Sequence, residues 1–137
     1  MIELLVHGTP IAQQRPRFSP KSGTVFDPQS KAKRVLKMMF TSQMVDKGLK
    51  MLPDGILQVE LYAHSPPPAS WPQKRLKCVE GSHKVTTPDI DNIAKAYLDI
   101  LNGIAYSDDK LIARLICEKR YSFNPRVQII ITQIGEK

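Results

Sequence analysis

The segment TTPDIDNIAKAYLDILNG, residues 86–103, has the pattern of an amphipathic helix that covers a sheet. Asp91, Lys95 and Asp99 step by four residues along its polar face. Gly103 is placed to end the helix. The apolar residues recur at helical spacing and form the opposite face, and they are Ile90, Ile93, Ala94, Tyr97, Leu98 and Leu101. We therefore predict a helix that buries one face and leaves a charged face exposed.

Apolar runs bounded by turn residues predict strands before and after this helix. These runs lie at residues 2–8, 56–65, 111–123 and 126–134. The sequence FNPR, residues 123–126, suits a tight turn, so we expect the last two strands to form a hairpin. The proline-rich stretch 9–26 is expected to be a long connection.

A second long helix is predicted before the strand at 56–65. Asp27 is a suitable N-cap, Pro28 fits the first helical position, and Gly48 is a suitable stop. Its expected apolar face consists of Ala32, Val35, Leu36, Met39, Phe40 and Met44. The basic segment SWPQKRLKCVEGSH, residues 70–83, is either a short helix or a mobile loop.

The element order is β-α-β-(α)-α-β-β, which predicts an α+β fold with a mixed sheet covered by helices. A length of 137 residues fits a single domain, residues 1–137, with its own core. The N-terminus lacks the pattern of a signal peptide and no apolar run is long enough to span a membrane, so no membrane association is expected. Cys78 and Cys117 form no CxxC pair, which is typical of reduced thiols in a cytoplasmic protein.

The chain is basic, with a formal charge of +7 and a sequence pI of about 9.5. Such a charge favours a polyanionic partner, most often nucleic acid, over a basic surface that serves only solubility. Two groups of basic residues stand out as candidate DNA contacts. They are Arg15 and Arg17 in the early connection, and Lys74, Arg75 and Lys84 before the helix at 90–101. Arg-Pro-Arg holds two guanidinium groups on a stiff backbone that suits phosphates.

Acidic residues concentrate at the start of this helix and shortly after its end. Each acid has an ordinary explanation when taken alone, as a charge at a helix N-terminus, an i,i+4 partner of Lys95 or a turn residue. Asp89 and Asp91, however, can face a common point outside the helix. If the following segment runs back beside the helix, Asp108 or Asp109 reaches the same point. Carboxylates that converge repel one another unless a divalent cation lies between them.

A metal-bound carboxylate cluster in a basic protein suggests phosphodiester hydrolysis. The cation would activate a water and stabilise the charge on the phosphate in the transition state. Lys95, one turn inside the helix, could contact the same phosphate as a point charge.

The stretch TPDIDNIAKAYLDILNGIAYSDDKLI, residues 87–112, resembles the signature of the RusA-type Holliday junction resolvases. The shared elements are Asp-x-Asp-Asn, a lysine four residues after the second Asp, an LDxLNG helix end and an Asp-Asp pair. GTPIAQQRPRF, residues 8–18, is similar to the N-terminal segment of phage and prophage members. The order of elements agrees along most of the chain.

This resemblance implies a homodimeric endodeoxyribonuclease that uses Mg²⁺ to resolve four-way branched DNA by paired symmetric nicks, in recombination and repair. It implies metal ligation by Asp89, Asp91 and Asp109 and an essential role for Lys95. Asp108 is an alternative to Asp109 as the third ligand. Asp99 matches a recurring acid that either takes part or holds Lys95 in place.

Other functions stay open on the sequence alone. A non-catalytic DNA-binding protein would use the acids only as caps and ion pairs, although carboxylates beside phosphates would repel its ligand. A metal-dependent nuclease for flaps or forks would share the same chemistry. A plain structural domain would leave the coincidence of acids, lysine and basic flank unexplained.

Overall fold

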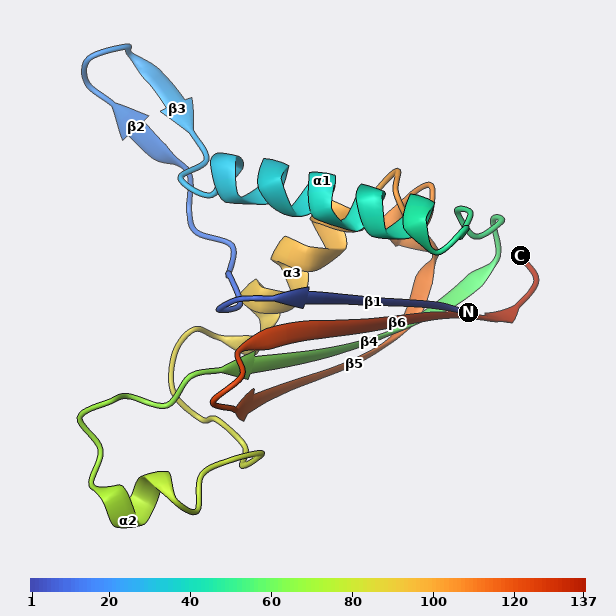
Figure 1. Cartoon of the computed structure of the whole chain (residues 1–137). Helices are drawn as coiled ribbons and strands as arrows, with labels where there is room; N and C mark the ends of the chain where they lie inside the picture. Colours follow the sequence, from blue (N-terminus) through green and yellow to red (C-terminus); the bar gives the residue numbers. More distant parts are fainter.

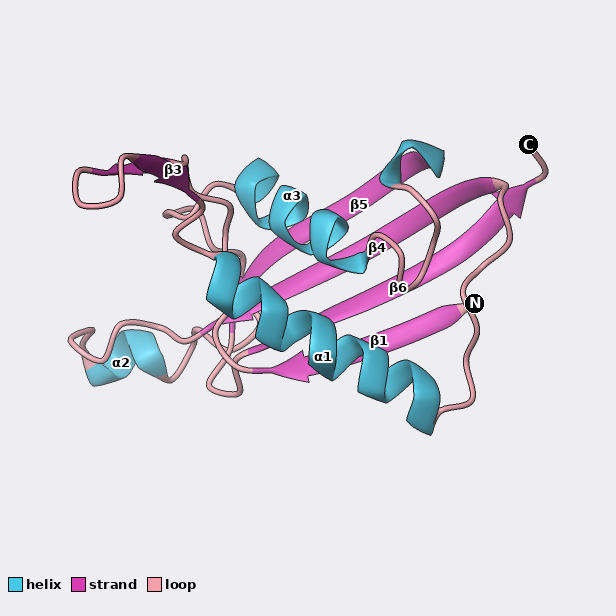
Figure 2. Ribbon diagram, turned by 90° about the horizontal axis from the view of Figure 1, so that it is seen from above, coloured by secondary structure: helices cyan, strands magenta, loops and turns pink.

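The computed structural model describes all 137 residues and consists of a four-stranded mixed sheet with two long helices on one face (Figures 1 and 2). The strands are β1 (Ile2–His7), β4 (Ile56–Ser65), β5 (Ile112–Tyr121) and β6 (Arg126–Gly135). Their order in the sheet is β1-β6-β4-β5. Strand β4 is parallel to β5 and antiparallel to β6, and β1 is antiparallel to β6. The predicted α+β fold is therefore confirmed.

The predicted hairpin between the last two strands is wrong, because β4 lies between β5 and β6. The chain crosses the end of β4 at residues 122–125 and returns on its other side. Burial explains this order. Val127, Ile129 and Ile131 on β6 are fully buried, which a central strand allows, whereas β5 is an edge strand with Leu115 exposed.

The connection at 9–26 contains a small hairpin that the sequence did not predict. Its strands are β2 (Arg17–Ser19) and β3 (Thr24–Phe26), and it projects away from the sheet (Figure 1). Gly23 adopts a positive φ of 67° at the turn, and its amide donates to the Ser19 carbonyl at 2.8 Å. The hairpin carries exposed apolar side chains, namely Phe18, Val25 and Phe26.

Helix α1 (Ser30–Asp46) begins later than predicted. Asp27 is not its N-cap, because the Asp27 carboxylate accepts from the Gln29 amide at 2.8 Å and from Lys33 Nζ at 3.0 Å. The Asp27 side chain therefore fixes the turn that precedes the helix. Gly48, with φ of 65°, follows the last residues of the helix as predicted.

The apolar face of α1 is narrower than its spacing predicts. Phe40 and Met44 are buried, whereas Val35 and Met39 are exposed by 49% and 43%. The helix crosses the sheet above β1, on which it packs through its C-terminal half. Gln43 fixes this contact, because its side-chain amide donates to the Leu5 carbonyl and its Oε1 accepts from the Leu5 amide.

Helix α3 (Ile90–Leu101) lies beside α1 on the same face of the sheet and is the more deeply packed of the two (Figure 2). Its buried residues are Ile93, Ala94, Ala96, Tyr97, Ile100 and Leu101. Ile90, expected on this face, is 43% exposed, because it begins the helix at the edge of the core. The helix presents its polar face to solvent, as predicted.

The basic segment at 70–83 contains a short helix, α2 (Gln73–Leu76), and is loop elsewhere, so the short-helix interpretation holds for four of its residues. This helix lies on a loop that projects beyond the ends of β4 and β5 (Figure 1). Trp71 packs there, with its ring 5.1 Å from the Tyr121 ring and the Arg75 guanidinium 3.4 Å above it. None of the helices combines the length and apolar character that crossing a membrane requires.

Candidate active site at the start of helix α3

Two carboxylates lie at the start of α3, and neither is used to neutralise a cation of the chain. Asp89 is the N-cap residue by position, but its side chain accepts no capping hydrogen bond. Asp91, in the first turn, accepts only from the amide of the next residue, Asn92, at 2.9 Å. Both carboxylates are exposed, and the two ion pairs of the chain lie elsewhere. The explanation of Asp89 as a capping side chain is therefore not supported.

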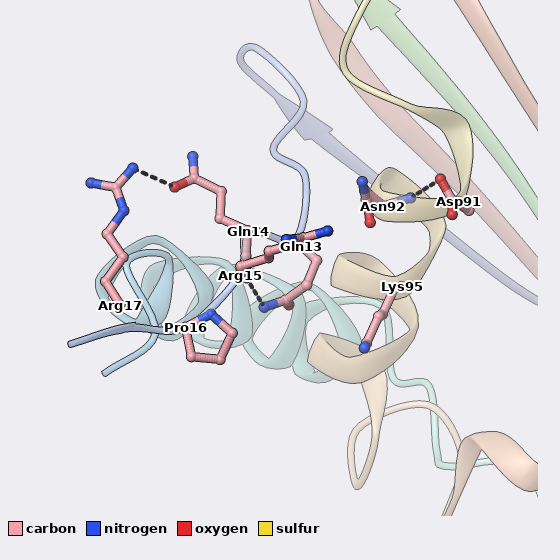
Figure 3. Close-up of a pocket in the computed structure, with 8 residues that line it drawn as sticks. All are labelled: Gln13, Gln14, Arg15, Pro16, Arg17, Asp91, Asn92 and Lys95. Carbon is pink, nitrogen blue, oxygen red and sulfur yellow. Dashed lines mark hydrogen bonds between the residues drawn. The ribbon is translucent and has the colours of Figure 1, made fainter. Parts of the chain in front are cut away.

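Lys95 is exposed on the same helix, four residues after Asp91. It forms no ion pair with Asp91 or with Asp99, so its ammonium group is not held by either acid. Figure 3 shows the side chains of Asp91 and Lys95 pointing apart. Lys95 extends into the space between α3 and the early loop, where a ligand of the opposite charge would meet it.

A pocket of about 770 Å³ separates α3 from the loop at residues 13–17 (Figure 3). It has no hydrophobic lining, and its residues are Gln13, Gln14, Arg15, Pro16, Arg17, Asp91, Asn92 and Lys95. The structure thus brings the predicted DNA contacts of the loop to the predicted site residues of the helix. A pocket of this size and polarity suits a sugar-phosphate backbone better than an apolar ligand.

Hydrogen bonds fix this loop to α3. The Ile11 amide donates to the Tyr97 hydroxyl at 3.1 Å, and the Gln13 amide donates to the Asn92 carbonyl at 2.9 Å. Burial raises the pKa of Tyr97 to about 12, so its hydroxyl stays neutral at physiological pH. Arg15 and Arg17 follow directly and are exposed.

A second hollow, of about 530 Å³, lies on the other side of the two carboxylates. Both Asp89 and Asp91 line it, together with His83, Lys84, Ile90, Cys117, Glu118 and Lys119. Asp91 therefore lies between two hollows that each carry basic side chains, and Asp89 lines the second of them. Residues 117–119 come from β5, so the sequence could place them here only if the strand order were known.

The remaining predicted DNA contacts lie in different settings. Lys84 is half-buried beside the acids, where its Nζ donates to Thr86 Oγ1 at 2.6 Å and lies 5.0 Å from the Tyr121 ring centre. Lys74 and Arg75 lie on α2, away from the start of α3 (Figure 1), and neither lines the two hollows. Arg75 instead stacks on Trp71.

Asp109 lies at the opposite end of α3. It opens a short 3₁₀ turn (Asp109–Leu111), with Asp99 and Asn102 as neighbours. Asp99 is eight residues beyond Asp91, which is about 12 Å along a helix axis. The segment after α3 thus does not return to the start of the helix, and the expected convergence of three carboxylates within one chain is wrong. Accordingly, nowhere in the chain do three Asp, Glu, His or Cys side chains lie close enough together to hold a metal ion.

The acids at this end perturb one another. Burial raises the pKa of Asp109, and the carboxyl groups of Asp108 and Asp99 raise it further. The pKa of Asp108 is lowered, chiefly because its carboxylate accepts from the Lys110 amide at 2.9 Å. Asp108 is thus occupied as the cap of the turn, which leaves Asp109 as the less engaged acid of the pair.

Asp89 and Asp91 fit a hard divalent cation without a third protein ligand. Mg²⁺ commonly keeps several waters and is bound by one or two carboxylates together with substrate phosphate oxygens. The two carboxylates are close in sequence, exposed to a shared hollow and free of ion pairs with the chain's own cations. The residues present therefore match the donor set that such an ion requires.

Comparison with known proteins identifies similar sequences over nearly the whole chain. The sequence model of the family described as Endodeoxyribonuclease RusA matches residues 7–132. A protein of Bacillus subtilis (strain 168), named as the uncharacterized protein YqaN, is 30% identical over 138 residues, which cover 98% of this chain and 97% of the relative. The residues that the family model matches include both long helices and the whole of β4 and β5.

Proposed function

The chain belongs to the RusA family of endodeoxyribonucleases, and we propose that it is a Mg²⁺-dependent enzyme that resolves four-way DNA junctions by paired symmetric nicks. One observation supports this most directly. Asp89 and Asp91 are unpaired carboxylates that share one hollow with Lys84 and Lys119, and Asp91 also lines the hollow that holds Arg15 and Lys95, in a chain with a formal charge of +7. Carboxylates in such a place weaken DNA binding unless they hold a cation that the phosphate also contacts.

Asp89 and Asp91 would hold the Mg²⁺ ion. When bound, the ion lowers the pKa of a water and neutralises charge on the phosphodiester. The chain's own contribution is positional, because Asp89 is the N-cap residue of α3 and Asp91 lies in its first turn. Lys95 contacts a non-bridging phosphate oxygen and stabilises the negative charge that grows there during hydrolysis. Its exposed, unpaired ammonium group supports this role.

Asp109 is proposed as the third carboxylate of the metal site. Within one chain it lies beyond the far end of α3, so it can join Asp89 and Asp91 only from a second chain or after a rearrangement. The proposed enzyme is a homodimer. A four-way junction offers two symmetry-related strands, and a two-fold dimer presents two sites to them.

The DNA backbone is bound by basic residues around the two acids. Arg15 and Arg17 contact phosphates from the loop side, and Lys84 contributes positive charge from the other side. Lys74 and Arg75 reach a more distant part of a branched substrate from α2. Such contacts read the shape of the backbone and carry no sequence information. The expected setting is the cytoplasm, in recombination or repair of cellular or prophage DNA.

A nuclease that acts on flaps or forks is the second candidate, since it would use the same metal chemistry. The β2–β3 hairpin and the α2 loop project from the sheet and carry Arg17, Lys74 and Arg75, and such projections favour a branched substrate over a linear one (Figure 1).

A cleavage assay tests the proposal. The protein is incubated with a synthetic four-way junction, a flap and a linear duplex, each with and without Mg²⁺. We expect paired nicks at symmetric positions of the junction, only with Mg²⁺ present. Preferred cutting of the flap would favour the second candidate. Tight junction binding with no cutting under any divalent cation would contradict both.

A further inference from the structure

Lys119 is a basic residue beside the two acids that lies outside the sequence motif. It belongs to β5, where it pairs with Ala63 of β4. Its Nζ donates two hydrogen bonds across more than thirty residues of sequence, to the Thr86 carbonyl at 2.6 Å and to the Pro88 carbonyl at 2.8 Å. Pro88 directly precedes Asp89, so the Lys119 ammonium group fixes the backbone immediately before the first acid of the site.

The backbone of Lys119 holds the same segment at a second point. Its carbonyl accepts from the Lys84 amide at 2.9 Å. The side chain and the main chain of one residue thus attach both ends of the segment 84–88 to the sheet. The other contacts of this segment with the sheet are weaker, such as the 3.3 Å approach of Thr86 Oγ1 to the Tyr121 hydroxyl.

The segment needs such an attachment because it has no regular structure of its own. Val85, Thr86 and Thr87 are exposed, with Val85 at 91%. Loops of this kind move more than the elements they connect. Hydrogen bonds from an ammonium group to carbonyl oxygens are roughly twice as strong as neutral ones, so Lys119 supplies the strongest contacts of the segment.

The orientation of Pro88 determines where Asp89 points. Mg²⁺ requires near-ideal octahedral geometry, so its carboxylates must be placed accurately. A misplacement of about 1 Å in a catalytic group can cost about a hundredfold in rate. Lys119 lines the same hollow as Asp89 and Asp91, which puts the attachment directly beside the groups that depend on it.

We propose that Lys119 is a positioning residue, which fixes the turn before α3 through the Thr86 and Pro88 carbonyls and so presents Asp89 and Asp91 in the geometry that a divalent cation needs. The expected effect on cleavage rests on the proposed function, whereas the attachment of the segment 84–88 by Lys119 does not. The two carbonyls use two of the three N–H donors of its ammonium group, so we expect Lys119 to act through the segment more than by binding DNA phosphates.

The test compares three variants with the wild type. Lys119→Met removes the ammonium group and keeps the length of the side chain. Lys119→Arg restores a cation that can donate to two carbonyls. Lys50→Met is the matched control, because Lys50 is exposed and far along the chain from the site. Each protein is measured by hydrogen exchange over residues 84–92, by Mn²⁺ binding, by junction binding in Ca²⁺ and by cleavage in Mg²⁺.

We expect Lys119→Met to increase exchange at residues 84–92 by about tenfold, to weaken Mn²⁺ binding and to slow cleavage by about tenfold or more, with junction binding within about twofold of wild type. Lys119→Arg should recover most of each loss, and Lys50→Met should match wild type. If Lys119→Met does not fold, Lys119→Gln, which keeps one neutral donor, is measured in its place.

Unchanged exchange at residues 84–92 in Lys119→Met would overturn the inference, whatever happens to cleavage. Loss of junction binding without a change in exchange would also overturn it, since Lys119 would then contact phosphates directly. A wild-type protein that binds Mn²⁺ but cuts no DNA would contradict the proposed function alone, because the exchange and Mn²⁺ measurements would still test the attachment.

Discussion

The two ends of helix α3 carry similar numbers of acids in opposite surroundings. At the start, Asp89 and Asp91 are exposed and both line the hollow that contains Lys119, and Asp91 also lines the hollow that contains Arg15 and Lys95. At the end, Asp109 is half-buried among other acids, and its pKa is raised by burial and by their charge. The acids at one end therefore lie beside basic side chains, whereas those at the other end lie beside one another and form no ion pair.

This difference shows that acids that are close in sequence need not share a role. A helix of twelve residues keeps its two ends about 18 Å apart, so acids at opposite ends cannot bind one ion within a chain. The acids at the start are exposed to a shared hollow, where they are free to ligate an ion. Those at the end form no ion pair within the chain, and a second chain or a metal ion would supply a positive partner.

The most damaging change is expected at the start of the helix. Asp91→Asn removes a metal ligand and keeps the size of the side chain, so cleavage should fall by about a thousandfold. Junction binding should stay the same or tighten, because one negative charge near the phosphates is removed. Single-turnover cleavage and gel-shift assays measure the two effects. Asp46→Asn, at the exposed end of α1, is the control, and normal cleavage by Asp91→Asn would refute the metal-site assignment.

The end of the helix is tested by Asp109→Asn, which should slow cleavage by about a hundredfold if the acid completes the site. Mixing this variant with Asp91→Asn shows where it acts. A site shared between chains regains activity in the mixed dimer, because one of its two sites then has both acids. A site within one chain stays inactive. Full activity of Asp109→Asn alone would leave the acids at this end with a structural role only.

Lys95→Ala should slow cleavage by about tenfold without unfolding the protein. The side chain is exposed and makes no ion pair, so its loss removes phosphate stabilisation and little packing. The rate and the thermal midpoint are measured on the same preparation. If the thermal midpoint falls and the cleavage rate falls only in proportion to the folded enzyme that is lost, Lys95 is instead a structural residue of the helix.

The loop that faces the start of α3 is expected to affect binding more than chemistry. Replacing both Arg15 and Arg17 by Ala should weaken junction binding equally for all sequences. The slope of log K against log salt should decrease by about one to two, because each phosphate that is no longer neutralised lowers it by close to one. Binding titrations at several salt concentrations give this slope. An unchanged slope would mean that these arginines do not contact the backbone.

The smallest effect is expected from the thiol that lines the second hollow. Burial raises the pKa of Cys117 to about 11, so the thiol stays protonated and adds no charge beside the acids up to about pH 9. Iodoacetamide at pH 8 should modify the exposed Cys78 and spare Cys117. Cysteine-resolved mass spectrometry follows both, and Cys117→Ala should cleave at the wild-type rate. Rapid modification of Cys117 would show that the hollow opens in solution.

Much of the fold could be predicted because its signals are local. The spacing of apolar residues defines α3, and alternation defines β4 within a residue of its observed ends. The position of β6 could not be predicted, since a tight turn such as FNPR allows a hairpin or a crossing equally well. The choice depends on which strand buries more surface, and that is a property of the assembled sheet.

Likewise, only part of the candidate site could be predicted from the sequence. The sequence motif predicted that Asp89, Asp91 and Lys95 share the start of one helix, because helical periodicity relates them. It could not predict that the chain after Gly103 turns away from that start, which leaves Asp109 beside Asn102. Nor could it identify Lys119, whose contact with Pro88 depends on the register of β4 and β5.

The attachment of the early loop to α3 has a consequence for where a strand would be cut. Tyr97 and Asn92 bind the backbone of residues 11 and 13, which ties the loop that carries Arg15 and Arg17 to the helix that carries Asp91. If the arginines hold a phosphate and the acids mark the cut, as proposed, the protein sets the distance between the two. The number of nucleotides between the held phosphate and the broken bond should then stay constant when the substrate changes in sequence or length.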